Sequence, residues 1–285
     1  MPALSPSKRP PSHSALSTRD FLASGVITLT TDFGHRGPFV GTMKGVMLGR
    51  FPSAQVIDLT HEIVVHWPAE AGFWLERSYR YFPRGTVHVA VVDPGVGTQR
   101  EIVLVIHDGH AFFAPDNGLL APLFEREKHA YRLLPENLAK FGIGAPSVTF
   151  HGRDIFAPIA AELASRAIRP EDLGPLVEEL VPSWVDEPIT SGSRIQGVVI
   201  AVDHFGNLIS NIPSELLDRF EAPIVHAGSI SVPIRRTYAD ARPGEYLALV
   251  NSFGTLEVAR AEQSAADGLG LSRGAPITVE ARPRE

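Results

Sequence analysis

The stretch AVVDPGVGTQR, residues 90–100, joins an apolar run to two side chains that could do chemistry. The run ends in Asp93, a Pro-Gly-x-Gly turn follows, and Arg100 comes seven residues after the aspartate. A carboxylate and a guanidinium held by one tight turn could act together on a reacting centre. An Asp-Pro-Gly sequence is also ordinary punctuation between two strands, so this stretch alone leaves both interpretations open.

Further polar clusters end or interrupt apolar runs elsewhere in the chain. They cover residues 31–34, 150–154, 203–207 and 251–254. Each has a structural alternative. Asp32 could cap the next helix, and Asp154 is expected to be the N-cap of its own helix. His151 alone could be a structural histidine, and Asp203 and Asp116 could be plain turn residues.

Metal binding is one generic interpretation of these clusters, because Asp32, Asp93, His151 and Asp154 could supply oxygen and nitrogen ligands. Their spacing matches no metal motif, since the chain has no HExxH sequence and no EF-hand loop. It also has no phosphate-binding P-loop and no GxSxG elbow. The chain contains no cysteine, which excludes thiolate ligands and a cysteine nucleophile. We therefore predict no metal site.

Composition and charge restrict the partners. The formal charge of -6 argues against a nucleic-acid partner, which usually meets a basic face. No apolar run approaches the ~20 residues of a membrane helix, so no membrane partner is expected. The Ser- and Pro-rich start predicts a disordered tail over residues 1–23 and does not resemble a secretory signal. A cytoplasmic protein is expected.

The first two thirds of the chain alternate strands and helices. Apolar and β-branched runs predict strands over 26–31, 55–59, 86–92, 102–106 and 111–114. Periodicity predicts helices over 39–50, 68–81 and 154–167. This alternation predicts an N-terminal α/β domain over residues 24–182, with a mainly parallel sheet sandwiched by helices. Asp32 and Asp93 follow predicted strands, so both could face one crevice beyond the carboxyl ends of the sheet.

The pattern changes near residue 183. Residues 183–193 contain small polar residues and a proline without periodicity, and we interpret them as a linker. Short apolar runs separated by turns follow, which predicts a C-terminal β-rich domain over residues 194–285, resembling a small antiparallel β-barrel. The expected strands cover 195–202, the region 224–232, 246–251, 255–261 and 277–281.

Seven motifs in order along the chain resemble one known family. They are TTDFG (30–34), HEIVVHWPAEAG (61–72), VVDPGVGTQR (91–100), APDNG (114–118), TFHGRDIFAP (149–158), DHFGNLISN (203–211) and NSFGTLEVA (251–259). Together they resemble the S-adenosylmethionine (SAM) hydrolases, also called SAM hydroxide adenosyltransferases. These are hydrolytic relatives of the SAM-dependent fluorinase and chlorinase. The resemblance runs from about Val26 to Ala281.

The resemblance implies an activity and an assembly. Members of the family hydrolyse SAM to adenosine and L-methionine, so SAM is a substrate and no cofactor is expected. They form homotrimers, with the substrate between the N-terminal domain of one subunit and the C-terminal domain of the next. The family's catalytic Asp, Arg and His match Asp93, Arg100 and His151. The sulfonium already makes methionine a good leaving group, so aligning a water behind ribose C5′ should supply most of the acceleration.

Substrate-binding roles carry over on the same basis. Asp32 matches the residue that binds the ribose diol, and Trp67 matches a tryptophan that packs on the substrate. Asp203 matches the partner of the methionine ammonium. Asn207 matches an adenine contact, with Phe205 beside it. A further contact, to the methionine carboxylate, is matched by Ser252. The fluorinase has an arginine after that serine, where this chain has Phe253.

Two positions separate the possible reactions. The halogenases carry a tyrosine where this chain has Asp93, and the fluorinase has a serine where this chain has Gly152. A carboxylate would repel a halide and suit a water, which favours hydrolysis over a SAM-dependent chlorinase. A non-catalytic sensor that binds SAM or adenosine is a second alternative, although it would have no use for a water-activating cluster. A metal-dependent hydrolase is the third.

Overall fold

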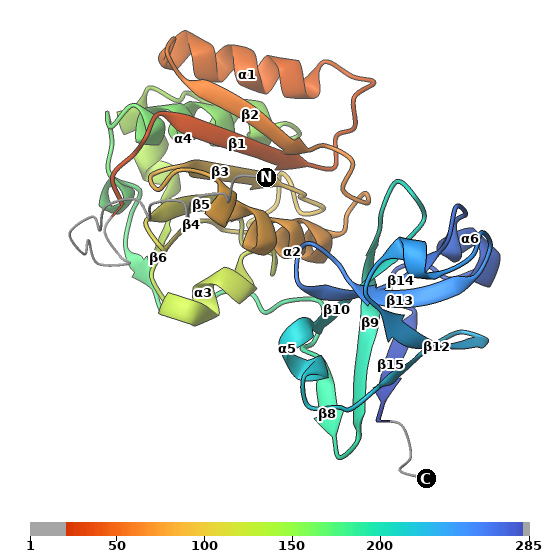
Figure 1. Cartoon of the computed structure of the whole chain (residues 1–285). Helices are drawn as coiled ribbons and strands as arrows, with labels where there is room; N and C mark the ends of the chain where they lie inside the picture. Colours follow the sequence, from red (N-terminus) through yellow and green to blue (C-terminus); the bar gives the residue numbers. More distant parts are fainter. Residues whose placement is uncertain (1–20, 282–285) are drawn as a thin grey trace, which may run out of the picture. The chain divides into compact units, whose positions relative to one another are not determined.

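The computed structural model describes residues 21–281, which divide into two compact units. The first ends at Pro182 and the second begins at Ser183 (Figure 1). Residues 1–20 of the predicted tail lie outside the described residues. Ala23, at its end, is buried, and its carbonyl accepts a 2.6 Å hydrogen bond from Arg166 Nη2. No helix in residues 21–281 has the length and apolarity needed to cross a membrane.

The N-terminal unit is built on one seven-stranded sheet in the order β2-β1-β3-β5-β4-β6-β7. Its strands are β1 (Val26–Thr31), β2 (Gln55–Thr60), β3 (Val87–Val91), β4 (Ile102–His107), β5 (His110–Pro115), β6 (Ala130–Arg132) and β7 (Leu176–Val177). The pairings of β1 with β2, of β1 with β3 and of β3 with β5 are parallel. The carboxyl ends of β1 and β3, where Asp32 and Asp93 follow, therefore lie at one edge of the sheet.

The other half of the sheet is antiparallel because β4 and β5 form a hairpin. Asp108 and Gly109 make its two-residue turn, and both have positive φ, at 45° and 73°. That conformation belongs to the turn type that suits the right-handed twist of paired strands. The α/β class predicted from the sequence is confirmed, and the sheet is mixed, with parallel strands in the half that carries the candidate site.

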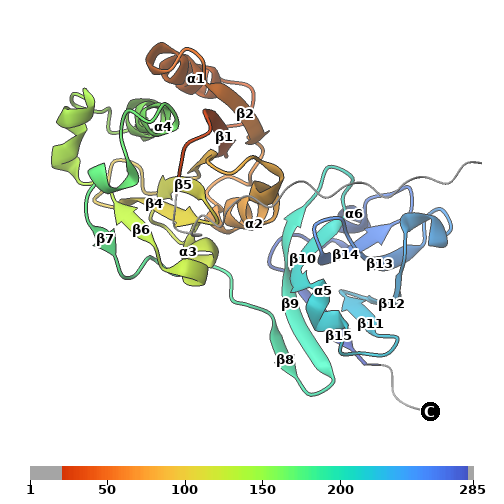
Figure 2. The same cartoon turned by 60° about the vertical axis from the view of Figure 1, so that its left-hand side comes forward.

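Helices cover both faces of this sheet (Figure 2). Apolar residues of α1 (Phe39–Arg50) and α4 (Ala157–Ala164) pack on one face with β1 and β3. Residues of α2 (Pro68–Ser78) and α3 (Ala121–Glu127) pack on the other face. Short helical turns complete the unit: 3₁₀ turns Tyr79–Tyr81, Pro135–Phe141 and Pro170–Asp172, and a π turn, Gly152–Phe156.

The C-terminal unit is a closed β-barrel. Strands run in the order β10-β14-β13-β12-β11-β15-β9, and β9 pairs with β10 to close the ring. The pairing of β12 with β13 is parallel and the others are antiparallel. The elements are β8 (Ile189–Ser191), β9 (Arg194–Val202), β10 (Leu208–Pro213), α5 (Ser214–Leu217), β11 (Ile224–Ala227), β12 (Ile230–Arg235), 3₁₀ turn Tyr238–Asp240, β13 (Tyr246–Val250), β14 (Thr255–Arg260), α6 (Ala265–Leu269) and β15 (Pro276–Glu280).

Four local details differ from the sequence-based expectations or alternatives. Strand β8 lies inside the segment interpreted as a linker and pairs with β9, while β10 was not among the expected strands. Asp154 is not an N-cap. The helical segment begins at His151, and Asp154 lies in the π turn, where its carboxylate accepts a 2.9 Å hydrogen bond from Ser147 N. Asp32 caps no helix either, since α1 begins at Phe39 after Pro38.

Two buried histidines form a chain inside the N-terminal unit. His88 Nδ1 lies 2.8 Å from Thr28 Oγ1, and His88 Nε2 lies 3.2 Å from His110 Nδ1. The ring of His88 stacks on Phe112, with centroids 4.8 Å apart. Burial, reinforced by the neighbouring His110, lowers the pKa of His88 well below its usual value. Burial lowers the pKa of His110 to about 4. Both rings are therefore neutral in the folded protein near pH 7.

We predict that this pair makes the fold acid-sensitive. The unfolded chain takes up protons at these histidines below about pH 6.5, while the folded protein resists protonation down to about pH 4. The contribution of this pair to the free energy of unfolding should thus be at its full value above pH 6.5, and the free energy should fall steadily towards pH 4. Urea unfolding of the wild type and of His110→Asn across this range checks it.

The variant should show a shallower loss between these pH values than the wild type. His204→Asn, which changes an exposed histidine, serves as the matched control and should keep the wild-type slope. Equal slopes for all three proteins would contradict a role for the buried pair.

Candidate active site

Asp93, Arg100 and His151 meet at the edge of the N-terminal sheet. Arg100 Nε lies 3.0 Å from each carboxylate oxygen of Asp93, and its Nη2 lies 2.5 Å from Oδ2. The same Nη2 lies 2.8 Å from His151 Nδ1. The side chains of Asp93 and Arg100 are 4% and 11% exposed, so the ion pair is largely shielded from solvent. The structure thus brings together all three residues predicted as catalytic.

The loop between Asp93 and Arg100 is closely packed at one glycine and requires glycine at another. A Cβ on Gly95 would lie 3.3 Å from Arg100 Cγ, tight against the ion pair. Gly97 has a φ of 79°, and a Cβ there would lie 2.3 Å from the carbonyl oxygen of Val148. The loop is thereby packed against the segment that leads into His151. Val92, the residue before Asp93, is held in place because its carbonyl oxygen accepts a 2.8 Å hydrogen bond from Asn117 Nδ2.

His151 has a defined tautomer in this arrangement. A guanidinium can only donate, so Nδ1 must accept from Arg100, and the proton of the neutral ring lies on Nε2. Burial and the adjacent Arg100 charge lower the pKa of His151. The ring is therefore neutral near pH 7 and offers an N–H donor at Nε2. Its place at the start of the π turn, a feature that often marks functional sites, sets the position of the ring.

A cavity of about 300 Å³ borders this cluster. It is lined by Asp32, Phe33, Phe39, Val65, His66, Val91, Asp93, Val96, Thr149, Phe150, His151 and Gly152. Asp32 Oδ2 accepts a 3.0 Å hydrogen bond from His66 N, which fastens the loop before α2. A carboxylate has about four acceptor sites, so Asp32 retains capacity for the hydroxyls of a ligand.

Gly152 lies in this wall with little room for a side chain. A Cβ at this position would lie 3.1 Å from Met43 Sδ and 3.1 Å from the Phe150 ring. Trp67 precedes α2 and does not line the cavity, although its neighbours Val65 and His66 do. Its contact with the substrate stays a prediction. No group of three or more His, Asp or Glu side chains within residues 21–281 is arranged to hold a metal ion.

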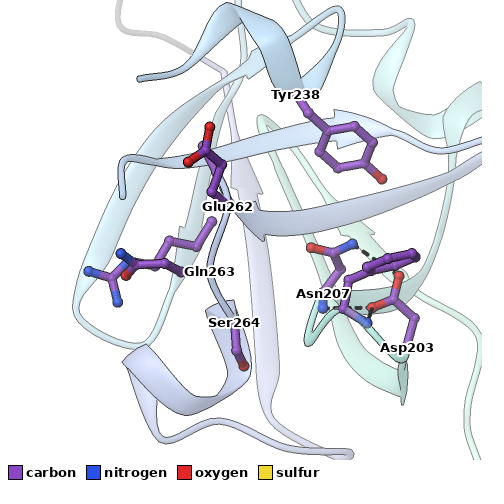
Figure 3. A pocket seen from close by; sticks show the side chains of 9 residues that line it. Asp203, Asn207, Tyr238, Glu262, Gln263 and Ser264 are labelled. Carbon is purple, nitrogen blue, oxygen red and sulfur yellow. Dashed lines mark hydrogen bonds between the residues drawn. The ribbon is translucent and has the colours of Figure 1, made fainter. Parts of the chain in front are cut away.

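A second, larger cavity lies in the C-terminal unit, with a volume of about 600 Å³. Asp203, Phe205 and Asn207, all predicted from the sequence, line it (Figure 3). Asp203 shapes the β9–β10 turn, because Oδ1 accepts from the backbone N–H groups of Phe205 and Asn207, each at 2.9 Å. Its Oδ2 accepts from Asn207 Nδ2 at 3.0 Å. Asp203 is thus a structural turn residue as well as a cavity residue.

Sequence reasoning missed the opposite wall of this cavity. That wall comprises Tyr238, Arg260, Ala261, Glu262, Gln263 and Ser264. Arg260 is held by a 3.0 Å bond from its Nε to Gly244 O and lies over the Tyr246 ring. These residues belong to segments without a recognisable motif, and long-range strand pairing in the barrel, including that of β14 with β10, brings them to Asp203. Ser252 lies in the exposed turn between β13 and β14 and does not line the cavity.

The two units match the two domains of one protein family. A model of the SAM hydroxide adenosyltransferase N-terminal domain matches residues 27–174, and a model of the C-terminal domain matches residues 197–278. The chain therefore belongs to the SAM hydroxide adenosyltransferase family, as the sequence resemblance predicted.

Individual relatives agree with this assignment. The chain is 37% identical over 258 residues to a Thermus thermophilus protein named (R)-S-adenosyl-L-methionine hydrolase, covering 87% of this chain and 97% of the relative. A Methanocaldococcus jannaschii protein of the same name is 33% identical over 250 residues, covering 82% of this chain and 88% of the relative. A fluorinase from an Actinoplanes species is more distant, at 27% over 291 residues, 89% of this chain and 97% of the relative.

A solved structure shows the same fold. The crystal structure of an uncharacterized conserved protein from Thermotoga maritima has a TM-score of 0.82 and 33% identity, and the match covers 90% of this chain and 100% of that one.

We predict that Gly97→Ala destabilises the loop that holds the cluster. A side chain at this φ, pressed against Val148 O, should lower the free energy of unfolding by roughly 2 kcal/mol. Denaturant unfolding measures the change. Gly144→Ala, where a Cβ meets no atom within 4 Å, is the matched control and should be close to neutral. Equal stabilities of the two variants would contradict the packing described here.

Proposed function

We propose that the protein hydrolyses SAM to adenosine and L-methionine by attack of water on ribose C5′. The observation that carries this proposal is the partly buried Asp93–Arg100–His151 cluster beside a cavity, in a chain of the SAM hydroxide adenosyltransferase family. The names of the relatives specify the (R) configuration at sulfur. We infer that this chain prefers the same sulfonium epimer.

The chemistry requires little of the leaving group. The water oxygen forms a bond to C5′ as the C5′–S bond breaks. The electron pair of the C5′–S bond stays on sulfur, and methionine leaves as a neutral thioether. The attacking oxygen becomes a protonated alcohol, which is strongly acidic. Even a carboxylate paired with a guanidinium can take that proton, so Asp93 is suited to accept it. No metal or cofactor is needed in this scheme.

The tautomer of His151 makes this residue a hydrogen-bond donor to the attacking water. With Nδ1 occupied by Arg100, the ring donates from Nε2 and can orient the oxygen of the water. Arg100 holds the carboxylate and the imidazole in register, and so acts mainly by positioning. This division leaves the water between one donor and one acceptor, the arrangement that points a lone pair towards C5′.

The remaining predicted residues have binding roles in the proposal. Asp32 would bind the ribose diol, and Trp67 would pack on the substrate. Asp203 would bind the ammonium, and Asn207 with Phe205 would contact the adenine. Ser252 would contact the carboxylate. We keep the homotrimer with sites at subunit interfaces, and a cytoplasmic location, as predictions from the sequence and the family resemblance.

We predict that Asp93→Asn lowers kcat at least ~10²-fold, because an amide cannot accept the proton of the water. Chromatography of adenosine and methionine measures the rate, with chloride and with EDTA as separate additions. Asp116→Asn is the matched control. Asp116 also follows a strand, but it accepts from Val181 N and does not line the cavity. It should keep near-wild-type activity.

Other outcomes identify the alternatives. A 5′-chloro-5′-deoxyadenosine product would show a chlorinase, and loss of activity in EDTA would show a metal-dependent hydrolase. Binding of SAM without turnover in the wild type would show a sensor. Unchanged activity in Asp93→Asn would contradict the role of the cluster.

We further predict that complementary inactive variants restore one another if the site lies between subunits. Asp93→Ala and Asp203→Ala should each be inactive alone. Mixed, dissociated and reassembled, they should regain part of the activity, because some interfaces then combine two intact halves. Light scattering of the wild type should give the mass of a trimer. A monomeric mass, or no recovery in the mixture, would contradict the interface arrangement.

A further inference from the structure

Glu257 is a buried acid that the proposed chemistry does not use. It lies in β14 and is 2% exposed, between the buried apolar residues Leu256 and Val258. Burying a carboxyl group is costly unless its oxygens are hydrogen-bonded. Both oxygens of Glu257 have partners, and these partners belong to two other segments of the C-terminal unit.

One partner is Tyr238, whose hydroxyl donates to Glu257 Oε1 at 2.6 Å. Tyr238 comes from the 3₁₀ turn after β12 and lines the 600 Å³ cavity together with Asp203 (Figure 3). The bond fixes the far end of the tyrosine ring. The orientation of this part of the wall therefore depends on Glu257.

The other partner is Asn251, whose Nδ2 donates to Glu257 Oε2 at 3.3 Å. Asn251 Oδ1 accepts from Phe253 N at 3.0 Å and from Thr255 N at 3.2 Å, which shapes the turn between β13 and β14. Ser252, predicted to contact the methionine carboxylate, lies in this turn. One carboxyl group thus fixes both a wall of the cavity and a turn that carries a predicted binding residue.

The electrostatic surroundings keep the phenol a donor. Burial and the hydrogen bond to Glu257 raise the pKa of Tyr238 well above its usual value. Burial raises the pKa of Glu257 as well, and the charge of Asp203 adds to it. Tyr238 therefore stays protonated and bonded to Glu257 throughout the physiological pH range.

We propose that Glu257 is a positioning residue that preforms the C-terminal part of the substrate site by holding Tyr238 and the Asn251 turn together. The proposal rests on the proposed function, because the cavity is taken to receive part of SAM. Glu257 touches no substrate in this account. Its removal should weaken binding and leave the chemical step at the other cavity unaffected.

Steady-state kinetics of Glu257→Gln, Tyr238→Phe and the double variant test it. Each single variant should raise KM about five- to tenfold while kcat stays within about twofold of the wild type. The amide that replaces the carboxylate keeps a single acceptor oxygen, so one of the two contacts is lost. Both changes weaken the Tyr238–Glu257 contact, so the double variant should raise KM by less than the product of the two single effects.

Ser210→Ala supplies the matched control. Ser210 is 1% exposed and donates to Leu256 O at 2.7 Å, in the barrel wall next to Glu257 but outside the cavity. Its loss should lower the melting temperature and leave KM unchanged. If Glu257→Gln also lowers the melting temperature with KM unchanged, its role is purely structural and the proposal is wrong. Multiplicative KM effects in the double variant would also overturn the coupling.

Failure of the proposed function gives a different result. In that case the wild type would hydrolyse neither SAM epimer, and calorimetric titration with adenosine would replace the kinetics. Glu257→Gln should then raise the dissociation constant of adenosine by the same factor, while Ser210→Ala should not. Unchanged affinity in Glu257→Gln, or no binding to the wild type, would overturn the positioning role.

Discussion

The candidate catalytic site depends on the hydrogen bonds that the guanidinium of Arg100 donates to two neighbouring side chains. The guanidinium holds the carboxylate of Asp93 through Nε and Nη2 and the imidazole of His151 through Nη2. Because a guanidinium only donates, it sets the tautomer of the histidine as well as the position of the aspartate. A lysine could neutralise the same carboxylate, but its point charge lacks the planar fork that orients two partners at once.

The sequence predicted most of what surrounds this interaction. The apolar run before Asp93 predicted a buried strand, and β3 is fully buried. The spacing of Val40, Met43 and Met47 predicted α1 with its observed bounds. Asp93, Arg100 and His151 could be proposed as catalytic from the sequence because each lies in a contiguous motif that resembles the family. The Asp108-Gly109 dipeptide between two apolar runs is a hairpin signal, and it accounts for the antiparallel half of the sheet.

Features created by tertiary packing could not be predicted in this way. The π turn after His151 has no local signature, and Asp154, which precedes an apolar helix, has the residue type of an ordinary N-cap. The wall formed by Tyr238 and Arg260 depends on long-range contacts, because β14 pairs with β10 and Tyr238 bonds to Glu257 of β14. Glu257 occupies a position in an apolar strand, and sequence alone does not tell which side chains reach its oxygens.

In the proposed reaction, a water held by the Asp93–Arg100–His151 cluster attacks ribose C5′ of SAM. The most direct measurement is mass spectrometry of the adenosine formed from (R)-SAM in water enriched in ¹⁸O. The label should appear in the 5′ hydroxyl of adenosine and not in methionine. Adenosine without the label, or label in the methionine product, would show that water does not attack C5′.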